Sequence, residues 1–87
     1  MTINDAYKFI EFQNRQIRKV NGLRIVYGNY EYRITYFGGF GAYVGIDYRQ
    51  VGKRNFKYFN GFGAYDCLTC GEVLKRIEKI ITNKNGE

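Results

Sequence analysis

The residues most suggestive of chemistry are two cysteines, Cys67 and Cys70, which stand in a CxxC spacing at the start of a predicted helix. A helix start lowers the pKa of a thiol, and CxxC pairs serve redox enzymes or supply half of a zinc site. A thioredoxin-like site needs a preceding βαβ unit, which the order of elements here lacks. A zinc site needs four ligands, so two chains would each have to contribute both thiolates. We favour a packing role, with one cysteine half-buried.

Acid–base catalysis has few candidate groups in this chain. It contains no histidine, and its eight acidic residues are scattered, with Asp47 alone in the segment 42–50. Hydrolysis and proton transfer require paired titratable groups that are gathered in a pocket. We therefore predict a non-enzymatic binding protein with no cofactor and no bound metal.

The charge of the chain indicates the class of partner. Fourteen lysines and arginines against eight acids give a net charge of +6, which attracts nucleic acid or an acidic protein or nucleoprotein surface. No apolar run is long enough to span a membrane, so we expect no membrane partner. No secretory signal is visible, and two cysteines do not form a disulfide framework, so we expect a cytoplasmic location.

Two predicted helices enclose the elements that would position a binding surface. Apolar residues at helical spacing predict a first helix over 2–19, which begins with a capping box of Thr2 and Asp5. A closing helix over 68–82 has a second such box, Thr69 and Glu72, and the tail 83–87 is expected to fray. We expect the whole chain, 1–87, to form a single α+β domain.

Between the helices the apolar residues alternate, which predicts an antiparallel meander of about four strands. A two-residue loop at Gly28-Asn29 would pair Ile25 with Tyr32. A glycine-rich connection over 37–41 leads to the third strand, and a three-residue loop over 51–53 would pair Tyr48 with Phe56 in a last strand over 55–59. These registers place the apolar residues on one face, so both helices should cover that face and leave the other open.

The open face is the predicted binding site, because it would combine cations with aromatic rings. Arg24 and Arg33 should lie opposite each other, and this repulsion needs relief from an anionic partner or from nearby Glu31. Aromatic side chains among these cations suit base stacking with phosphate contacts, a protein interface, or simply a solvated sheet. The candidate contact residues are Arg24, Arg33, Phe37, Tyr43, Arg49, Lys53, Arg54, Lys57 and Phe59.

An internal repeat lies within the predicted strands. The segment 36–43, YFGGFGAY, recurs at 58–65 as YFNGFGAY, with seven of eight positions identical. The favoured interpretation is structural: two similar strand exits in which glycines permit unusual backbone and Phe40 and Phe62 close the ends of the core. The alternative is a pair of glycine nests that bind phosphate, although Asp66 would repel an anion beside the second copy.

The order of helix, sheet and helix is similar to that of double-stranded-RNA-binding domains, whose two helices also share one sheet face. That family carries a lysine cluster at the start of its second helix, where this chain has Thr69-Cys70-Gly71-Glu72. The segment from Tyr32 through Gly61-Phe62 and the closing helix also resembles the three-stranded DNA-binding arms of phage integrases. Both resemblances imply nucleic-acid binding.

A second hypothesis is a protein that inhibits or adapts a host protein by direct binding. The chain is short and rich in Lys, Asn, Ile and Tyr, which is typical of AT-rich genes in low-GC bacteria and their phages. In size it is similar to phage or mobile-element inhibitors such as anti-CRISPR proteins. A third hypothesis is a homodimer that pairs its exposed sheets.

Overall fold

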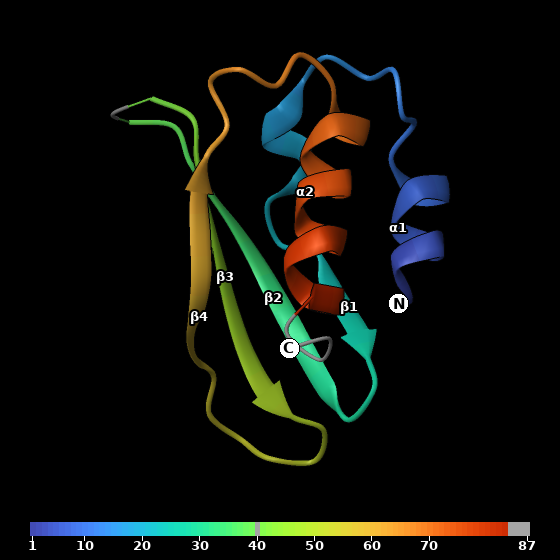
Figure 1. Ribbon diagram of the computed structural model, residues 1–87, viewed down its shortest axis with the longest axis vertical. Helices are drawn as coiled ribbons and strands as arrows, with labels where there is room; N and C mark the ends of the chain where they lie inside the picture. Colours follow the sequence, from blue (N-terminus) through green and yellow to red (C-terminus); the bar gives the residue numbers. More distant parts are fainter. Residues whose placement is uncertain (40, 84–87) are drawn as a thin grey trace.

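A four-stranded antiparallel sheet forms the centre of the structure, a computed structural model that describes residues 1–39 and 41–83 (Figure 1). The strand order β1-β2-β3-β4 confirms the predicted meander. Phe40 and the predicted frayed tail beyond Asn83 lie outside the described residues. The elements are α1 (Ile3–Phe9), η1 (Ile17–Val20), β1 (Arg24–Tyr27), β2 (Tyr30–Phe37), β3 (Tyr43–Gln50), β4 (Lys57–Gly63) and α2 (Cys70–Asn83).

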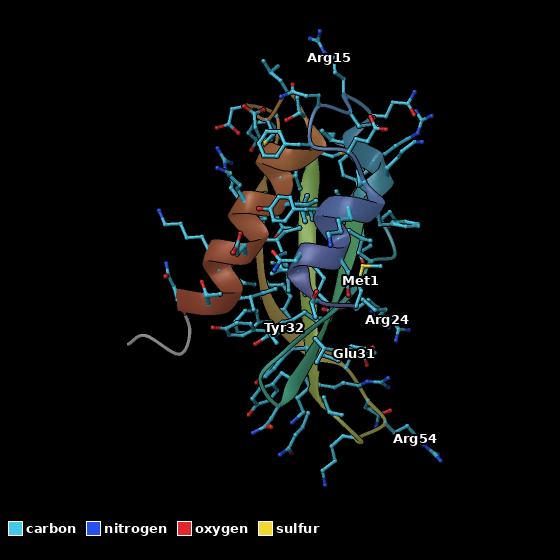
Figure 2. All side chains as sticks on the ribbon, turned by 90° about the vertical axis from the view of Figure 1, so that its right-hand side faces the viewer. Met1, Arg15, Arg24, Glu31, Tyr32 and Arg54 are labelled. Atoms are coloured by element: carbon cyan, nitrogen blue, oxygen red, sulfur yellow. The ribbon has the colours of Figure 1, made fainter. Side chains whose placement is uncertain are left out.

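Both helices lie on the same side of the sheet, with α1 beside α2 and next to β1 (Figures 1 and 2). The α+β fold class is thereby confirmed. None of the helices in the described part of the chain is long and apolar enough to cross a membrane. The buried hydrophobic residues come from the inner sheet face, from both helices and from the segments that join them: Ala6, Ile10, Val20, Leu23, Ile25, Tyr32, Ile34, Val44, Ile46, Ala64, Cys67, Cys70, Val73, Leu74, Ile77 and Ile81.

The β1–β2 register is the predicted one. Ile25 pairs with Tyr32, Arg24 pairs with Arg33, and Gly28 in the connecting turn has a φ of 63°. Because side chains at paired positions share a face, Arg24 and Arg33 stand together on the outer face, opposite the helices.

The predicted β3–β4 register and the predicted last strand over 55–59 are wrong. Tyr48 pairs with Lys57 rather than Phe56, and the register shifts between Ile46 and Asp47. The connection is therefore longer than three residues, and β4 runs to Gly63. The physical reason lies on the outer face, where three arginine side chains surround the Phe56 ring and hold it out of the ladder.

The predicted first helix over 2–19 is also wrong in extent. Its capping box of Thr2 and Asp5 is present, but α1 ends at Phe9 and only the short η1 follows. The intervening backbone turns toward α2, where the carbonyl of Asn14 accepts from the Cys70 N–H at 2.7 Å and that of Phe12 accepts from the Gly71 N–H at 2.9 Å. The first N–H groups of a helix have no acceptor within the helix, so at the start of α2 these two carbonyls supply the acceptors. A first helix that continued through residues 12 and 14 would use the same carbonyls for its own hydrogen bonds and leave the α2 N–H groups without a partner.

The start of α2 combines this backbone cap with a side-chain cap. Thr69 and Glu72 exchange the reciprocal hydrogen bonds of the predicted capping box, at 3.1 and 3.3 Å. Leu68, expected in the apolar stripe of the helix, precedes it and is exposed, while both cysteines turn inward. The Phe12 ring lies over Gly71 so closely that a Cβ at this position would overlap it.

We predict that Gly71→Ala lowers the free energy of unfolding by about 1–3 kcal/mol, because the added methyl group collides with the ring and displaces the Phe12 carbonyl. Alanine would otherwise stabilise a helix by about 1 kcal/mol relative to glycine. Urea unfolding of the wild type, G71A, F12A and the double mutant measures the coupling. In the Phe12→Ala background the same substitution should be neutral or stabilising; an equal loss in both backgrounds would contradict the steric explanation.

Candidate functional site

Three arginines on the outer sheet face surround one aromatic ring. The guanidinium carbons of Arg24, Arg33 and Arg49 lie 4.9, 4.3 and 4.4 Å from the centroid of the Phe56 ring. A cation above an aromatic face is attracted by the ring quadrupole. We call these four residues the arginine cluster.

Two carboxylates complete the cluster. Glu31 contacts Arg24 at 3.5 Å and Arg49 at 2.7 Å, and Asp47 contacts Arg33 at 2.9 Å. Figure 2 shows Arg24 and Glu31 near one another, at some distance from Arg15 at the far end of the molecule. Three guanidinium groups against two carboxylates leave one net positive charge. The repulsion between Arg24 and Arg33 is therefore relieved within the chain, partly by Glu31 as expected and partly by Asp47 and Phe56.

The arginines of the cluster lower the pKa of Glu31. Partial burial by itself raises the pKa of this carboxyl, but the hydrogen bond and charge of Arg49, with a smaller contribution from Arg24, outweigh it. The net result is a pKa below the usual 4.5. Glu31 therefore stays ionised between its two arginines at neutral pH.

Beside the arginine cluster, the outer face carries four exposed aromatic rings, which we call the aromatic row: Phe37, Tyr43, Tyr58 and Tyr65, with 53%, 40%, 67% and 78% of their surface exposed. Phe37 and Tyr43 have ring centroids 6.1 Å apart, and a hydrogen bond to Tyr58 raises the pKa of Tyr43. These contacts join Phe37, Tyr43 and Tyr58 into one surface.

Glycines on the neighbouring strands make room for the rings. A Cβ at Gly61 would lie 2.7 Å from the Cζ of Tyr43, and one at Gly63 would lie 2.6 Å from the Cζ of Tyr65. Real Cβ atoms do not approach other carbons so closely, so both rings lie flat on bare backbone. Sheet glycines covered by aromatic rings are a known stabilising arrangement.

The internal repeat contributes to this arrangement, since Tyr43 ends the first copy and Tyr65 ends the second, while Gly61 and Gly63 both belong to the second copy. The Ala64 N–H donates to the Ala42 carbonyl at 2.5 Å, and Tyr43 pairs with Gly63, so the last residues of the two copies pair antiparallel. Phe62 packs against the core as expected, whereas Phe40 lies outside the described residues. The Gly63 carbonyl accepts from Arg76, which also pairs with Asp66. These contacts favour the structural interpretation over a phosphate nest.

The structure brings together five of the nine predicted contact residues on the outer sheet face. Arg24, Arg33, Arg49, Phe37 and Tyr43 share the outer face. Lys53 and Arg54 lie exposed in the β3–β4 connection.

Phe59 and Lys57 stand on the helix side, which corrects their predicted placement on the outer face. The Phe59 ring lies 5.3 Å from that of buried Tyr32, and Lys57 pairs with inward-facing Tyr48. The cause is the register shift at the start of β4, which turns residues 57–59 to the face opposite the expected one.

The residues that sequence reasoning missed are Phe56, Tyr58 and Tyr65. The repeat contained a signal for the last two, because each copy begins and ends with tyrosine and places glycines at alternating positions. Nothing comparable marked Phe56.

The CxxC pair is less reactive than its position suggested. Cys67 and Cys70 are both buried, and burial raises the pKa of each thiol, so the expected lowering by the helix start is wrong. The Cys70 thiol donates to the Gln16 carbonyl at 3.3 Å. Within 1–39 and 41–83, no three His, Cys, Asp or Glu residues gather as metal ligands would.

We predict that Phe56→Leu costs about 1–2 kcal/mol of unfolding free energy, because leucine keeps much of the apolar volume but removes the ring that three cations contact. Thermal and urea unfolding measure the loss. The matched control is Phe9→Leu, an exposed ring on α1, which should stay within about 0.5 kcal/mol of the wild type. Equal effects of the two substitutions would show that the arginine contacts contribute nothing.

A second prediction concerns pH. Because the folded pKa of Glu31 is lowered, its contribution to stability is fully present above about 4.5 and is lost as the pH falls through the lower folded value. Glu31→Gln should therefore destabilise the protein at pH 7, by on the order of 1 kcal/mol, and the difference from the wild type should shrink toward pH 3. Exposed Glu11→Gln is the control. A difference that stays constant with pH would refute the ion-pair explanation.

Comparison with known proteins gives no guide to function, so the proposals below are argued from the chemistry of these surfaces. No family model, no curated protein and no solved structure matches this chain.

Proposed function

We propose that the protein binds single-stranded nucleic acid, alone or within a nucleoprotein complex, across its outer sheet face. Bases stack on the aromatic row, and phosphates contact the arginine cluster. The observation that supports this proposal is the placement of four exposed rings and three arginines on the sheet face opposite α1 and α2.

The aromatic row has the properties of a stacking platform. Its rings lie against the sheet where glycines leave space, so they are held in place without being buried. Base stacking on a protein ring contributes about 1–3 kcal/mol per base and tolerates any sequence, because every base has a π-face. A duplex keeps its bases stacked on one another, so a single strand is the better ligand.

The arginine cluster can contact phosphate without losing its internal ion pairs. A guanidinium group has five N–H donors, and the side chains of Arg24 and Arg33 are 47% and 41% exposed. With Lys53 and Arg54 nearby in the β3–β4 connection, the positive charge extends beyond the cluster. Binding through such contacts releases counterions and weakens as salt rises.

One observation favours the alternative of direct protein binding, as an inhibitor or adapter of a host protein. Because Glu31 and Asp47 offset most of its charge, the arginine cluster is a weaker anion attractor than its three cations suggest. Tyrosine and arginine are also the residues that dominate binding energy at protein interfaces. A face-to-face homodimer would use the same rings.

We predict that Tyr58→Ala and Tyr65→Ala each weaken binding of a fluorescent single-stranded oligonucleotide of about 12 nucleotides by roughly 5- to 100-fold, as the loss of one stacked base implies. Fluorescence anisotropy at low and moderate salt measures the affinity, with a duplex of the same sequence binding more weakly. Both tyrosines are more than half exposed, so the substitutions should leave the fold intact.

Phe9→Ala is the matched control, because this ring is equally exposed but lies on α1, on the helix side of the sheet. It should bind the oligonucleotide like the wild type. If single-stranded DNA and RNA both fail to bind the wild type at low salt, the nucleic-acid proposal is wrong. A protein partner that survives nuclease treatment and is lost in Tyr58→Ala would then establish the alternative.

A further inference from the structure

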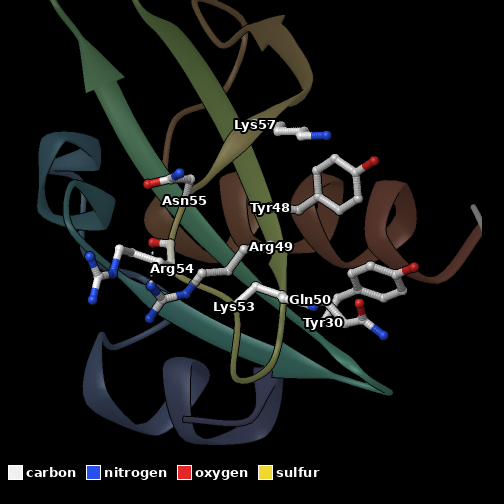
Figure 3. A pocket seen from close by; sticks show the side chains of 8 residues that line it. All are labelled: Tyr30, Tyr48, Arg49, Gln50, Lys53, Arg54, Asn55 and Lys57. Atoms are coloured by element: carbon white, nitrogen blue, oxygen red, sulfur yellow. Dashed lines mark hydrogen bonds between the residues drawn. The ribbon is translucent and has the colours of Figure 1, made fainter.

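An open hollow of about 410 Å³ lies at the end of the sheet, where β3 and β4 are joined (Figure 3). Among the described residues that line it, four are cationic and none is acidic, in contrast to the arginine cluster. The lining residues are Tyr30, Tyr48, Arg49, Gln50, Lys53, Arg54, Asn55 and Lys57.

The cations of the hollow differ in how much they are already engaged. The guanidinium group of Arg49 is held by Glu31 at 2.7 Å, and it also donates to the Arg54 carbonyl at 3.0 Å, so it shapes the wall. Lys53 and Lys57 are exposed, and each ammonium group has three donors. These two lysines are therefore the groups best able to receive an anion.

Tyrosines provide the other side of the hollow. The rings of Tyr30 and Tyr48 have centroids 5.5 Å apart, and Lys57 shares the face of Tyr48, its paired residue. Figure 3 shows Tyr30, Tyr48 and Lys57 extending to one side of the sheet, while Arg54 and Asn55 extend to the other. Hydroxyl and ammonium donors thus lie along the same side.

We propose that this hollow binds a phosphate monoester through Lys53 and Lys57. A monoester carries about 1.5 to 2 negative charges at pH 7 and three acceptor oxygens, so it can meet two ammonium groups at once. A phosphodiester offers less charge and fewer free oxygens. The monoester has two sources, the terminal phosphate of a nucleic-acid strand or a free small phosphate; only the first rests on the proposed function.

Four probes distinguish these sources: inorganic phosphate, a mononucleotide, and one short oligonucleotide with and without a 5′-phosphate. Calorimetry and anisotropy give the affinities for the wild type, the double variant K53Q/K57Q and the control Lys79→Gln, an exposed lysine on α2. The double variant should lose at least about tenfold in affinity for the phosphorylated probes, since two cations facing the anion are removed. The control should match the wild type.

The outcomes separate the proposals. Tighter binding of the phosphorylated than of the hydroxyl-ended strand, lost in K53Q/K57Q, identifies a strand end as the ligand. Binding of inorganic phosphate or mononucleotide while the hydroxyl-ended strand fails leaves the hollow as a site for small phosphates and rejects the nucleic-acid proposal alone. The phosphate proposal is overturned if no probe gains affinity from its phosphate, or if K53Q/K57Q binds every phosphorylated probe as tightly as the wild type.

Discussion

Burial of one sheet face against α2 is the constraint on which the rest of the structure depends. The helix contributes Val73, Leu74, Ile77 and Ile81 to the core, and the strands supply Ile25, Tyr32, Ile34, Val44 and Ile46 from the facing side. The register of the first three strands follows, because a slip by one residue would turn these side chains to solvent. The shape of the first helical segment follows as well, because its backbone leaves the helix after Phe9 to supply carbonyls to the start of α2.

The outer face is exposed to water, so side-chain contacts other than burial must hold the four strands together there. One half does so with charge: three arginines share two carboxylates and one phenylalanine ring, so like charges that would repel across β1 and β2 become a network. The other half does so with aromatic rings that cover glycines, namely Tyr43 over Gly61 and Tyr65 over Gly63. The single strand of nucleic acid proposed as the ligand would meet planar rings in the second half and the one unbalanced positive charge of the arginine cluster in the first.

The hollow at the β3–β4 end adds a second positively charged surface next to the outer face. The register shift that moved Phe59 and Lys57 away from the outer face also placed Lys57 beside Tyr48. The described residues that line the hollow therefore include four cations and no acidic side chain. Arg49 and Arg54 belong both to the wall of the hollow and to the outer-face side, and their contact links the two surfaces. A nucleic-acid strand bound on the aromatic row, as proposed, could therefore place its terminal phosphate in the positively charged hollow.

The sequence by itself determined the fold class, the order of the strands, the β1–β2 register, both capping boxes and five outer-face residues, because alternation and capping are local properties of neighbouring residues. Only the tertiary structure decided where the first helix stops, since the donors that its carbonyls satisfy lie more than fifty residues away at Cys70 and Gly71. It also decided the β4 register. Local alternation favoured an inward Phe56, but three arginines from different strands hold that ring outside, and no local pattern records an attraction assembled from Arg24, Arg33 and Arg49.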